Sequence, residues 1–380
     1  MRHEVLVIGA GPAGISSAYY LTKAGIPFRL VDRADVPAST WANLYPTLEL
    51  NTAGFVSHLP GRRIPLSYGV FPSGKQFYRY ILNYLKQYPL PIEYGVDVTR
   101  VAPEGDGWRV ETNKDSDVYP AVILATGRFG SPYMPSIPGQ EAFTGQLMHA
   151  HDFHAPERFA GQRVLVVGSG PSGVDIAVAL VGHAAKPVYL AIRSDILIAR
   201  KFPYGLPNTV WQILLYPLPE RVRKPLNDKI VYQGYGDMDD LSMKFARNRD
   251  QRLGTFAPVR GHQLIDAVRA GDIQPVNGLA RLYDRCAVLD DTTQLEIDTV
   301  ILGTGYRPVI EFLDFPYQMD EADWHLEIDR QTYQVKGCRG LYLVGWYYRG
   351  LGPLHNIRHE AQTVVQQIQR TLPYTVARRE

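Results

Sequence analysis

The feature of this sequence that most constrains its fold is a glycine pattern, G-x-G-x-x-G, that occurs twice. Each copy follows a short apolar run, residues 4–8 and residues 163–167, and precedes a helical pattern. In such a loop the first glycine permits a tight turn and the second lets the backbone approach a pyrophosphate, while the third lets the helix pack close to the sheet. The sequence therefore predicts an α/β chain with two dinucleotide-binding (Rossmann-like) units, whose glycines are Gly9, Gly11, Gly14, Gly168, Gly170 and Gly173.

The two units differ in the residue that ends their second strand. After the first loop, a helix over residues 15–24 ends at Gly25, and the strand over 27–32 ends in Asp32. The corresponding strand of the second unit, over 188–192, is followed by Arg193 and Ser194. An acid accepts a ribose hydroxyl but repels a 2′-phosphate, which arginine binds. The first loop therefore suits FAD and the second NADPH, although Arg193 could also be a solvated charge at a strand end.

Two strands ending in small residues indicate where the chain passes between the units. Ala125-Thr126-Gly127 ends a buried strand, and Gly303-Thr304-Gly305 repeats the pattern. Small residues are expected there because a side chain would strike a bound nucleotide. A proline-rich connector over 128–139 follows the first pattern. We expect a discontinuous FAD-binding domain, residues 1–135 and 306–380, with the NADP-binding domain inserted as residues 136–305.

The composition excludes several other classes of protein. The 380 residues are too many for one ordinary core, which favours two domains. A net charge of +2 without a basic stripe argues against nucleic-acid binding. Two distant cysteines, Cys286 and Cys338, indicate a reducing compartment and exclude disulfide reductase chemistry, which needs a C-x-x-C pair. No apolar run reaches membrane-spanning length, so the sequence predicts a soluble, cytoplasmic protein.

The segment between the two glycine loops resembles the fingerprint of the flavin-containing monooxygenase family, F-x-G-x-x-x-H-x-x-x-F. Nearly the whole chain is similar to that family, especially to its short bacterial members and the plant YUCCA-type enzymes. Baeyer–Villiger relatives carry tryptophan where Phe153 stands, so the resemblance favours oxygenation of nitrogen or sulfur. Besides the glycine loops and strand ends, the residues that carry it are Trp41, Asn51, Phe143, Gly145, His149, Phe153 and Tyr306.

The resemblance implies a reaction and roles for individual residues. NADPH would reduce FAD, and the reduced flavin would react with O2 to give a C4a-hydroperoxyflavin that oxygenates a soft nucleophile, sulfur or amine nitrogen. Asn51 would lie against the reactive edge of the flavin and steady the peroxide or the nucleotide, and His149 would arrange the linkers and the nicotinamide nucleotide without acting as a base. Further residues expected to line the cofactors are Pro12, Ala13, Arg33, Trp41, Val98, Pro171, Ser172 and Gly345.

Other interpretations of these residues remain open. Asn51-Thr52 is also a common turn sequence. His149, His151 and His154, and likewise His355 and His359, have spacings found in metal sites. A metal site needs a rigid scaffold, however, and the helical pair lacks the glutamate of the zinc-protease motif, so no metal is expected.

The segment from about 199 to 255 breaks the pattern and predicts a largely helical insertion. Its apolar face could bind a lipid-like substrate, a partner or a membrane surface, or pack on its own protein. The sequence leaves open a homodimer, the substrate and two other functions. One is an NAD(P)H oxidase or electron-transfer flavoprotein that releases peroxide, and the other is a nucleotide-binding sensor.

Overall fold

The structure is a computed structural model, and it describes residues 4–193, 196, 198–232, 241, 259–320, 325–346 and 351–372. The chain divides into two compact units. Unit 1 comprises residues 1–43, 52–131 and 307–380, and unit 2 comprises residues 44–51 and 132–306. The crossings fall at 131/132 and 306/307, close to the expected 135/136 and 305/306. The eight residues 44–51, expected in the first domain, associate with unit 2.

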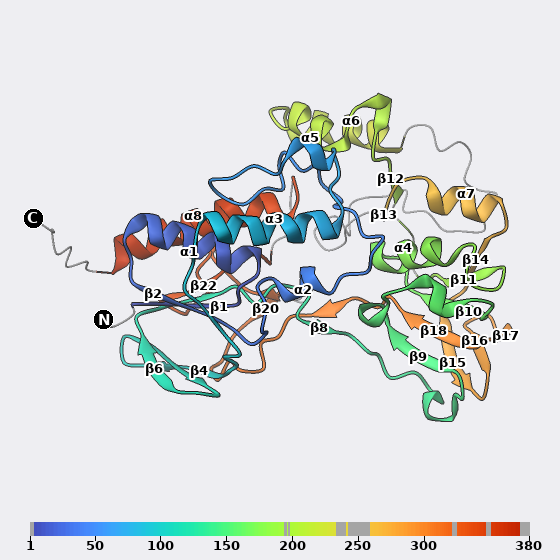
Figure 1. Cartoon of the computed structure of the whole chain (residues 1–380), viewed down its shortest axis with the longest axis horizontal. Coiled ribbons are helices and arrows are strands. Elements are labelled where there is room, and N and C mark those ends of the chain that lie inside the picture. The colour runs from blue at the N-terminus through green and yellow to red at the C-terminus, as the bar shows by residue number, and fades with distance from the viewer. Residues whose placement is uncertain are drawn as a thin grey trace, which may run out of the picture. The chain divides into compact units, whose positions relative to one another are not determined.

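Unit 1 is built on a parallel sheet with strand order β22-β7-β1-β2-β3 (Figure 1). Helices α1 and α8 pack together over one face, and the antiparallel sheet β4-β5-β6 covers the other, where Leu6 and Ile8 meet Val101, Trp108 and Val110. Its elements are β1 (Val5–Ile8), α1 (Pro12–Ala24), β2 (Phe28–Asp32), α2 (Ser39–Ala42), α3 (Gly74–Gln87), β3 (Ile92–Tyr94), β4 (Val98–Glu104), β5 (Gly107–Thr112), β6 (Ser116–Tyr119), β7 (Ala121–Leu124), β20 (Met319–Asp320), β21 (His325–Leu326), β22 (Leu341–Leu343) and α8 (Pro353–Thr371).

Unit 2 repeats this plan with the order β9-β18-β10-β11-β14. Val164 and Val166 of β10 face the helices, whereas Leu165 faces the antiparallel sheet β15-β16-β17. Its elements are β9 (Gln146–His149), β10 (Val164–Val167), α4 (Pro171–Leu180), β11 (Val188–Ala191), β12 (Ile198–Ala199), α5 (Asn208–Leu215), α6 (Glu220–Tyr232), β13 (Val259–Arg260), α7 (Gln263–Arg269), β14 (Ile273–Val276), β15 (Leu279–Tyr283), β16 (Cys286–Leu289), β17 (Gln294–Glu296) and β18 (Thr299–Leu302). Two-residue strands at the crossings are β8 (Ser131–Pro132) and β19 (Tyr306–Arg307).

The predicted fold class, two dinucleotide-binding units in an α/β chain, is confirmed. Both central strands are flanked by parallel neighbours in register, β1 by β2 and β7, and β10 by β11 and β18. Short buried strands alternating with helices produce such sheets, because each βαβ crossover places a helix on the sheet face. The helix predicted to end at Gly25 does so, with that glycine left-handed at φ 69°.

The sequence predicts one strand over residues 92–98 and another over 295–302, and both predictions were wrong in extent. The strand expected over 92–98 is divided into β3 and β4, because Gly95 between them is left-handed at φ 63°. The strand expected over 295–302 is likewise two strands in different sheets. β17 pairs antiparallel with β16, and β18 pairs parallel with β10, so the chain changes sheet at Ile297 and Asp298.

Candidate functional site

The three glycines of the first loop meet different surroundings. A Cβ at Gly9, whose φ is 104°, would lie 2.6 Å from the Ala125 carbonyl oxygen, and one at Gly14 would lie 1.8 Å from the Gly9 oxygen. A Cβ at Gly11 would meet no atom of the described residues within 4 Å. Packing of the protein itself therefore demands the outer two glycines. The middle one leaves open space at the amino end of α1, where peptide N–H groups attract a pyrophosphate.

The second loop repeats this arrangement in unit 2. A Cβ at Gly168, with φ 124°, would lie 2.4 Å from the Gly303 oxygen, and one at Gly173 would lie 2.2 Å from the Gly168 oxygen. A Cβ at Gly170 again meets nothing within 4 Å in the part of the chain that the structure describes. Each unit thus has a loop whose middle glycine, at the amino end of α1 or α4, is required by no described neighbour.

Equivalent backbone hydrogen bonds within each unit show which residues at the strand ends correspond. Gly9 N–H donates to the Val31 oxygen at 2.8 Å, and Gly168 N–H donates to the Ala191 oxygen at 3.0 Å. The residue that follows is Asp32 in unit 1 and Ile192 in unit 2. Unit 2 therefore has an apolar residue where unit 1 has its acid, and Arg193 corresponds to the next position, Arg33.

The Asp32 carboxylate is held by the loop that it faces. Its Oδ2 accepts from Ala10 N–H at 2.6 Å and its Oδ1 from Ala34 N–H at 2.8 Å. Each oxygen keeps a further lone pair, so the group can still accept a ribose hydroxyl. Arg193 is exposed, and no residue in the described part of the chain hydrogen-bonds or ion-pairs with it. The charge of Arg193 is therefore available to an anion. Ser194, the other residue expected at this strand end, lies outside the described residues.

The small-residue strand ends are also equivalent, because Ala125 N–H donates to the Ile8 oxygen and Gly303 N–H to the Val167 oxygen. The two threonines that follow have different partners. Thr304 Oγ1 donates to the Tyr133 oxygen at 2.5 Å, whereas the buried Thr126 Oγ1 has no hydrogen-bond partner within the described ranges. A buried hydroxyl without a partner is costly. Next to the first glycine loop, it suits a site completed by a ligand.

The third strand end of unit 1 brings a carboxyl group to the same edge. Gly345 N–H donates to Glu360 Oε2 at 2.6 Å, and a Cβ at Gly345 would lie 2.8 Å from that of Ala13. Glu360 is 2% exposed, and burial raises the pKa of its carboxyl to about 7. Sequence reasoning missed Glu360. The available signal was an acid inside the apolar stripe that Ile357, Ala361 and Val364 form on α8.

The segment 44–51 is attached to unit 2 by three kinds of contact. The Tyr45 hydroxyl donates to Asp175 Oδ2 on α4 at 3.0 Å, Leu48 packs on the apolar core, and Glu49 forms an ion pair with Lys201. Burial raises the pKa of Asp175 to about 6, against the lowering effect of its bond with Tyr45. Neither Tyr45 nor Asp175 was predicted as a site residue, because 130 positions separate them.

Asn51 lies at the end of this segment and is half-buried. No residue in the described ranges hydrogen-bonds to its side-chain amide, and it caps no helix. Its chain neighbour Thr52 bonds to Ser57 at 2.7 Å and lies against Gly352, which precedes α8. The amide of Asn51 is therefore not used by the turn in which it sits.

The other residues expected to line the cofactors lie on several elements of the two units. Trp41 packs on Phe77, with ring centroids 4.4 Å apart, and Arg33 donates to the Gly130 oxygen at 3.0 Å. Val98 is the first residue of β4 and packs on the apolar cluster between the parallel sheet and the antiparallel sheet β4-β5-β6. Val96 lies nearer to the first glycine loop, because its N–H donates to the Asp32 carbonyl oxygen. Pro12, Ala13, Pro171 and Ser172 form the first turns of α1 and α4.

His149 uses both ring nitrogens within unit 2. Its Nδ1 accepts from His151 N–H at 3.0 Å, and the other nitrogen, Nε2, then donates to the Gly305 oxygen at 3.0 Å. The ring also meets Tyr306 edge-on at 5.1 Å. Burial lowers the pKa of His149, which is 2% exposed, so the ring stays neutral. This histidine fixes the return crossing; its expected contact with the nicotinamide nucleotide stays a prediction.

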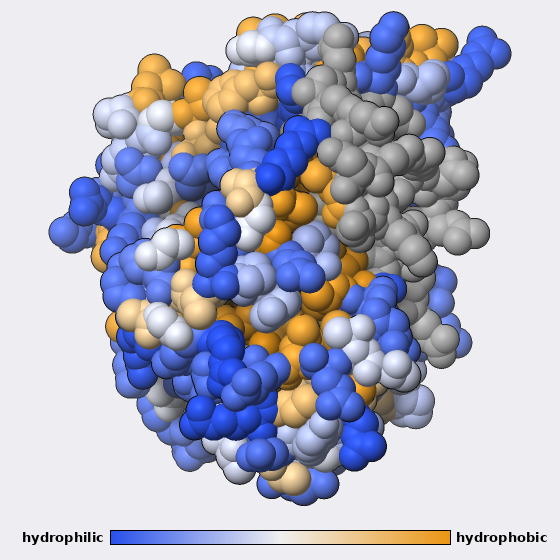
Figure 2. Space-filling model, turned by 90° about the vertical axis from the view of Figure 1, so that its right-hand side faces the viewer, coloured by the Kyte–Doolittle hydropathy of each residue, from blue (hydrophilic) through white to orange (hydrophobic). Residues whose placement is uncertain are grey.

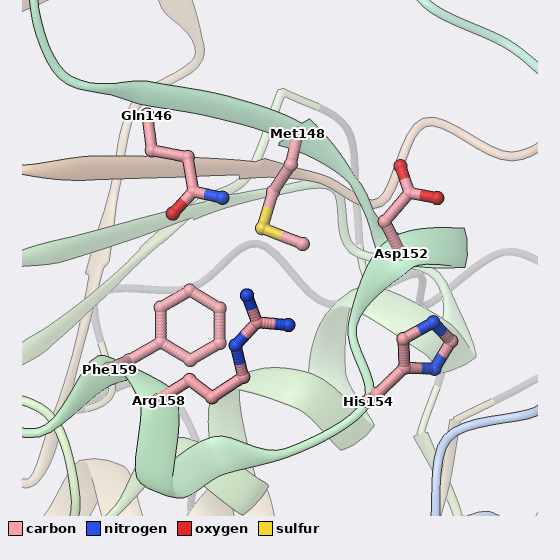
Figure 3. A pocket seen from close by; sticks show the side chains of 6 residues that line it. All are labelled: Gln146, Met148, Asp152, His154, Arg158 and Phe159. Atoms are coloured by element: carbon pink, nitrogen blue, oxygen red, sulfur yellow. The ribbon is translucent and has the colours of Figure 1, made fainter.

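A pocket of about 300 Å³ lies beside the segment that follows β9. Figure 3 shows Arg158 reaching into it towards Met148, with Asp152 and His154 on one side. Its lining also includes Gln146 and Phe159, but none of the residues predicted to bind a cofactor. This pocket is therefore distinct from the positions at which the sequence predicts the two nucleotides.

Two of the histidines considered as metal ligands, His149 and His355, have hydrogen-bond partners within the protein. Arg358 donates to His355 Nδ1 at 2.8 Å and contacts the ring of His58. Within the described ranges, no group of three His, Cys, Asp or Glu side chains could hold a metal ion. In the same part of the chain, no helix is long and apolar enough to cross a membrane.

Comparison with known proteins agrees with this geometry. Residues 6–203 match the model of the family described as pyridine nucleotide-disulphide oxidoreductase. A probable indole-3-pyruvate monooxygenase of Arabidopsis thaliana, YUCCA1, is 28% identical over 362 residues, covering 92% of this chain and 86% of that protein. The structure of a flavin-containing monooxygenase from Stenotrophomonas maltophilia is 24% identical, with a TM-score of 0.72, covering 97% of this chain and 98% of that one. NADP+-bound cyclohexanone monooxygenase from Rhodococcus is 15% identical, with a TM-score of 0.71, over 97% of this chain and 84% of that one.

Two dinucleotide loops on two parallel sheets define an oxidoreductase with a pair of nucleotide-binding units. The chain belongs to the pyridine nucleotide-disulphide oxidoreductase family. The resemblance to flavin-containing monooxygenases that the fingerprint predicted is confirmed, because proteins of that kind match nearly the whole chain in sequence and in fold. Cys286 lies in unit 2 and Cys338 in unit 1, and both are free.

Proposed function

We propose that this protein is an FAD- and NADPH-dependent monooxygenase that transfers one oxygen atom of O2 to a small molecule bearing a soft nucleophile, sulfur or amine nitrogen. The observation that carries the proposal is the repeated loop, in which the middle glycine faces open space while its neighbours are packed. Two such loops without a cysteine pair leave the flavin to react with O2. The scarcity of cysteine also supports a cytoplasmic location.

Unit 1 would hold FAD. The N–H groups at the amino end of α1 would bind the pyrophosphate, Asp32 would accept a ribose hydroxyl, and Thr126 would gain the hydrogen bond that it lacks. A bound flavin would supply hydride acceptance and O2 activation. The remaining groups proposed to line this site are Gly9, Gly11, Pro12, Ala13, Gly14, Arg33, Trp41, Val98, Ala125, Gly127 and Gly345.

Unit 2 would hold NADPH. The amino end of α4 would bind the pyrophosphate, and Arg193 would bind the 2′-phosphate with charge-assisted hydrogen bonds. Ile192 supports this choice, since the position that carries an acid in unit 1 has no charge to repel the phosphate here. The other groups proposed for this site are His149, Gly168, Gly170, Pro171, Ser172, Gly173, Ser194, Gly303, Thr304 and Gly305.

Asn51 would supply the one polar side chain dedicated to the reacting oxygen. Its amide has no partner among the described residues, so both its N–H2 donor and its oxygen acceptor can serve a ligand. A donor held near the reacting oxygen would direct that oxygen to the substrate. No acid–base pair is required, because a soft nucleophile needs little activation.

The proposal is tested on the purified protein. We expect a yellow protein that oxidises NADPH in air and converts thioanisole or a tertiary amine to its oxide, with label incorporated from isotopically labelled O2. A colourless protein that FAD cannot reconstitute would overturn the assignment of unit 1. Peroxide formed in step with NADPH oxidation, without any labelled product, would instead identify an NAD(P)H oxidase.

The role of Asn51 is tested separately with Asn51→Asp, which keeps the size of the side chain but replaces the donor by a carboxylate. We expect NADPH oxidation to continue while peroxide replaces oxygenated product. Asn43→Asp, at an exposed asparagine of the preceding loop, is the matched control. Unchanged coupling in Asn51→Asp would remove that residue from the mechanism.

A further inference from the structure

Helix α5 is oriented against the usual rule that polar residues face water. Its polar Asn208 and Thr209 are 1% and 0% exposed, whereas Ile213 and Leu214 are 41% and 58% exposed. Asn208 Oδ1 is buried without a hydrogen-bond partner among the described residues, and Asn208 Nδ2 donates to the Arg200 oxygen at 3.3 Å. The helix therefore exposes Ile213 and Leu214 at its carboxyl end, although its Asn208 and Thr209 pack within the unit.

Exposed apolar side chains are concentrated in the segment that contains this helix. The described residues include seventeen large hydrophobic or tyrosine side chains that are exposed, and nine of them lie within residues 202–226, which makes the exposure local. Figure 2 shows hydrophobic and hydrophilic residues mixed along its upper edge, the height of α6 in Figure 1. We call the nine residues the α5–α6 patch: Phe202, Tyr204, Leu206, Ile213, Leu214, Tyr216, Leu218, Val222 and Leu226.

Basic residues accompany this patch. Helix α6 carries four basic residues, Arg221, Arg223, Lys224 and Lys229, against the acids Glu220 and Asp228. The Arg223 guanidinium lies 6.0 Å from the centre of the Tyr216 ring, so charge and apolar surface are directly adjacent. Leucine and tyrosine beside a local excess of basic residues are typical of segments that rest in the interface of an anionic bilayer.

We propose that the α5–α6 patch docks this protein peripherally on the surface of an anionic lipid bilayer. Exposed apolar side chains are scattered singly on an ordinary protein surface, whereas those of this patch are gathered in one region. The accompanying basic residues favour acidic headgroups over a neutral partner. The proposal is independent of the redox chemistry, since none of the residues assigned to a nucleotide belongs to the patch.

Sedimentation with lipid vesicles tests this proposal on the full chain. We expect binding to vesicles of phosphatidylcholine and phosphatidylglycerol and at least roughly tenfold weaker binding to phosphatidylcholine alone, since electrostatic attraction to anionic lipid adds to apolar burial. The double variant Leu214→Ser/Tyr216→Ser should lose most of the binding to anionic vesicles. Leu66→Ser, at a side chain that is 91% exposed in unit 1, is the matched control and should bind as the unaltered protein does.

Charge is tested with Arg221→Glu/Arg223→Glu, which should abolish the preference for anionic vesicles. Circular dichroism and thermal unfolding show whether each variant is folded. The proposal is overturned if the unaltered protein binds neither kind of vesicle, or if Leu66→Ser loses as much binding as the double variant. It is also overturned if light scattering shows a dimer that the double variant dissociates and no vesicle binds, since a second copy then covers the patch.

Discussion

The hydroxyl of Tyr45 donates a hydrogen bond of 3.0 Å to Oδ2 of Asp175, joining the segment 44–51 to the helix behind the second glycine loop. The Tyr45 ring is 7% exposed within the core of unit 2. Burial and the neighbouring carboxylate raise the pKa of the Tyr45 hydroxyl, so it keeps its proton and acts as the donor. Since Asn51 ends the same segment, this bond helps to fix the residue to which we assign the reacting oxygen.

Tyr45→Phe should destabilise the protein in a pH-dependent manner. The pKa of Asp175 is about 6, so the bond reaches a charged acceptor at pH 8 and a mostly neutral one at pH 5. Bonds to charged groups contribute about 1.5–3 kcal/mol and neutral ones about 1 kcal/mol. Thermal unfolding should therefore show a larger loss at pH 8 than at pH 5. The control, Tyr317→Phe at a residue 37% exposed, should show little at either pH, and an equal loss at both for Tyr45→Phe would contradict the argument.

The parts of the site that were predicted are those encoded by neighbouring residues. The roles of Gly9 and Gly14 follow from the geometry of one tight turn, and Asp32 follows from the length of one βαβ unit. Of the two strands that were wrong, the one over 92–98 is interrupted by its own Gly95, whereas the one over 295–302 depended on a distant partner. Asp298, where the chain changes sheet, accepts from Arg163 N–H, and that residue is 135 positions away.

Residues held by long-range contacts gave weaker signals in the sequence. Tyr45 stands in a loop, and nothing near it in the sequence indicates Asp175 as its partner. Glu360 could have been noticed as a carboxyl group on an apolar helical face. Its bond to Gly345, however, depends on how α8 packs on β22, which the pattern of one helix does not show.

Alanine in place of each middle glycine should weaken the binding of one cofactor without affecting the other. Gly11 and Gly170 have φ of −78° and −77°, which alanine adopts without strain, and a Cβ there meets no protein atom. Gly11→Ala should fold yet retain little flavin. Gly170→Ala should retain flavin and bind NADPH at least about tenfold more weakly, because the methyl group holds the phosphate off the backbone.

Gly14→Ala is the contrasting variant, since its Cβ would lie 1.8 Å from the Gly9 oxygen. We expect it to express poorly or to unfold at much lower temperature. Visible absorption and NADPH titration measure the two cofactors. Normal flavin content in Gly11→Ala would show that the open space at this glycine is not the pyrophosphate site.

Arg193→Ala should weaken NADPH binding selectively. Loss of charge-assisted bonds to a 2′-phosphate costs about 1.5–3 kcal/mol, or roughly 10–100-fold in affinity. NADH lacks that phosphate, so its binding should change little. Arg33→Ala, at the corresponding position of unit 1, is the control and should leave the ratio of the two affinities unchanged. A similar loss for both nucleotides in Arg193→Ala would assign this arginine a structural role.

Glu360→Gln should stabilise the protein at alkaline pH. Burial raises the pKa of this carboxyl from 4.5 in the unfolded chain to about 7 in the fold. A raised folded-state pKa contributes stability that is present below pH 4.5 and is lost as the pH rises towards 7. Glutamine is neutral at every pH, and its side-chain oxygen can still accept from Gly345 N–H. The variant should therefore match the unaltered protein near pH 4.5 and exceed it at pH 8 by about 3 kcal/mol.

Thermal unfolding midpoints at several pH values check the prediction for Glu360. Glu157→Gln, at an exposed carboxyl in unit 2, is the control and should leave the pH profile unchanged. A gain for Glu360→Gln that is equal at acid and alkaline pH would mean that removal of a buried charge is not its cause. A loss at pH 8 would show that the charged carboxylate stabilises the strand end at Gly345 by more than its burial costs.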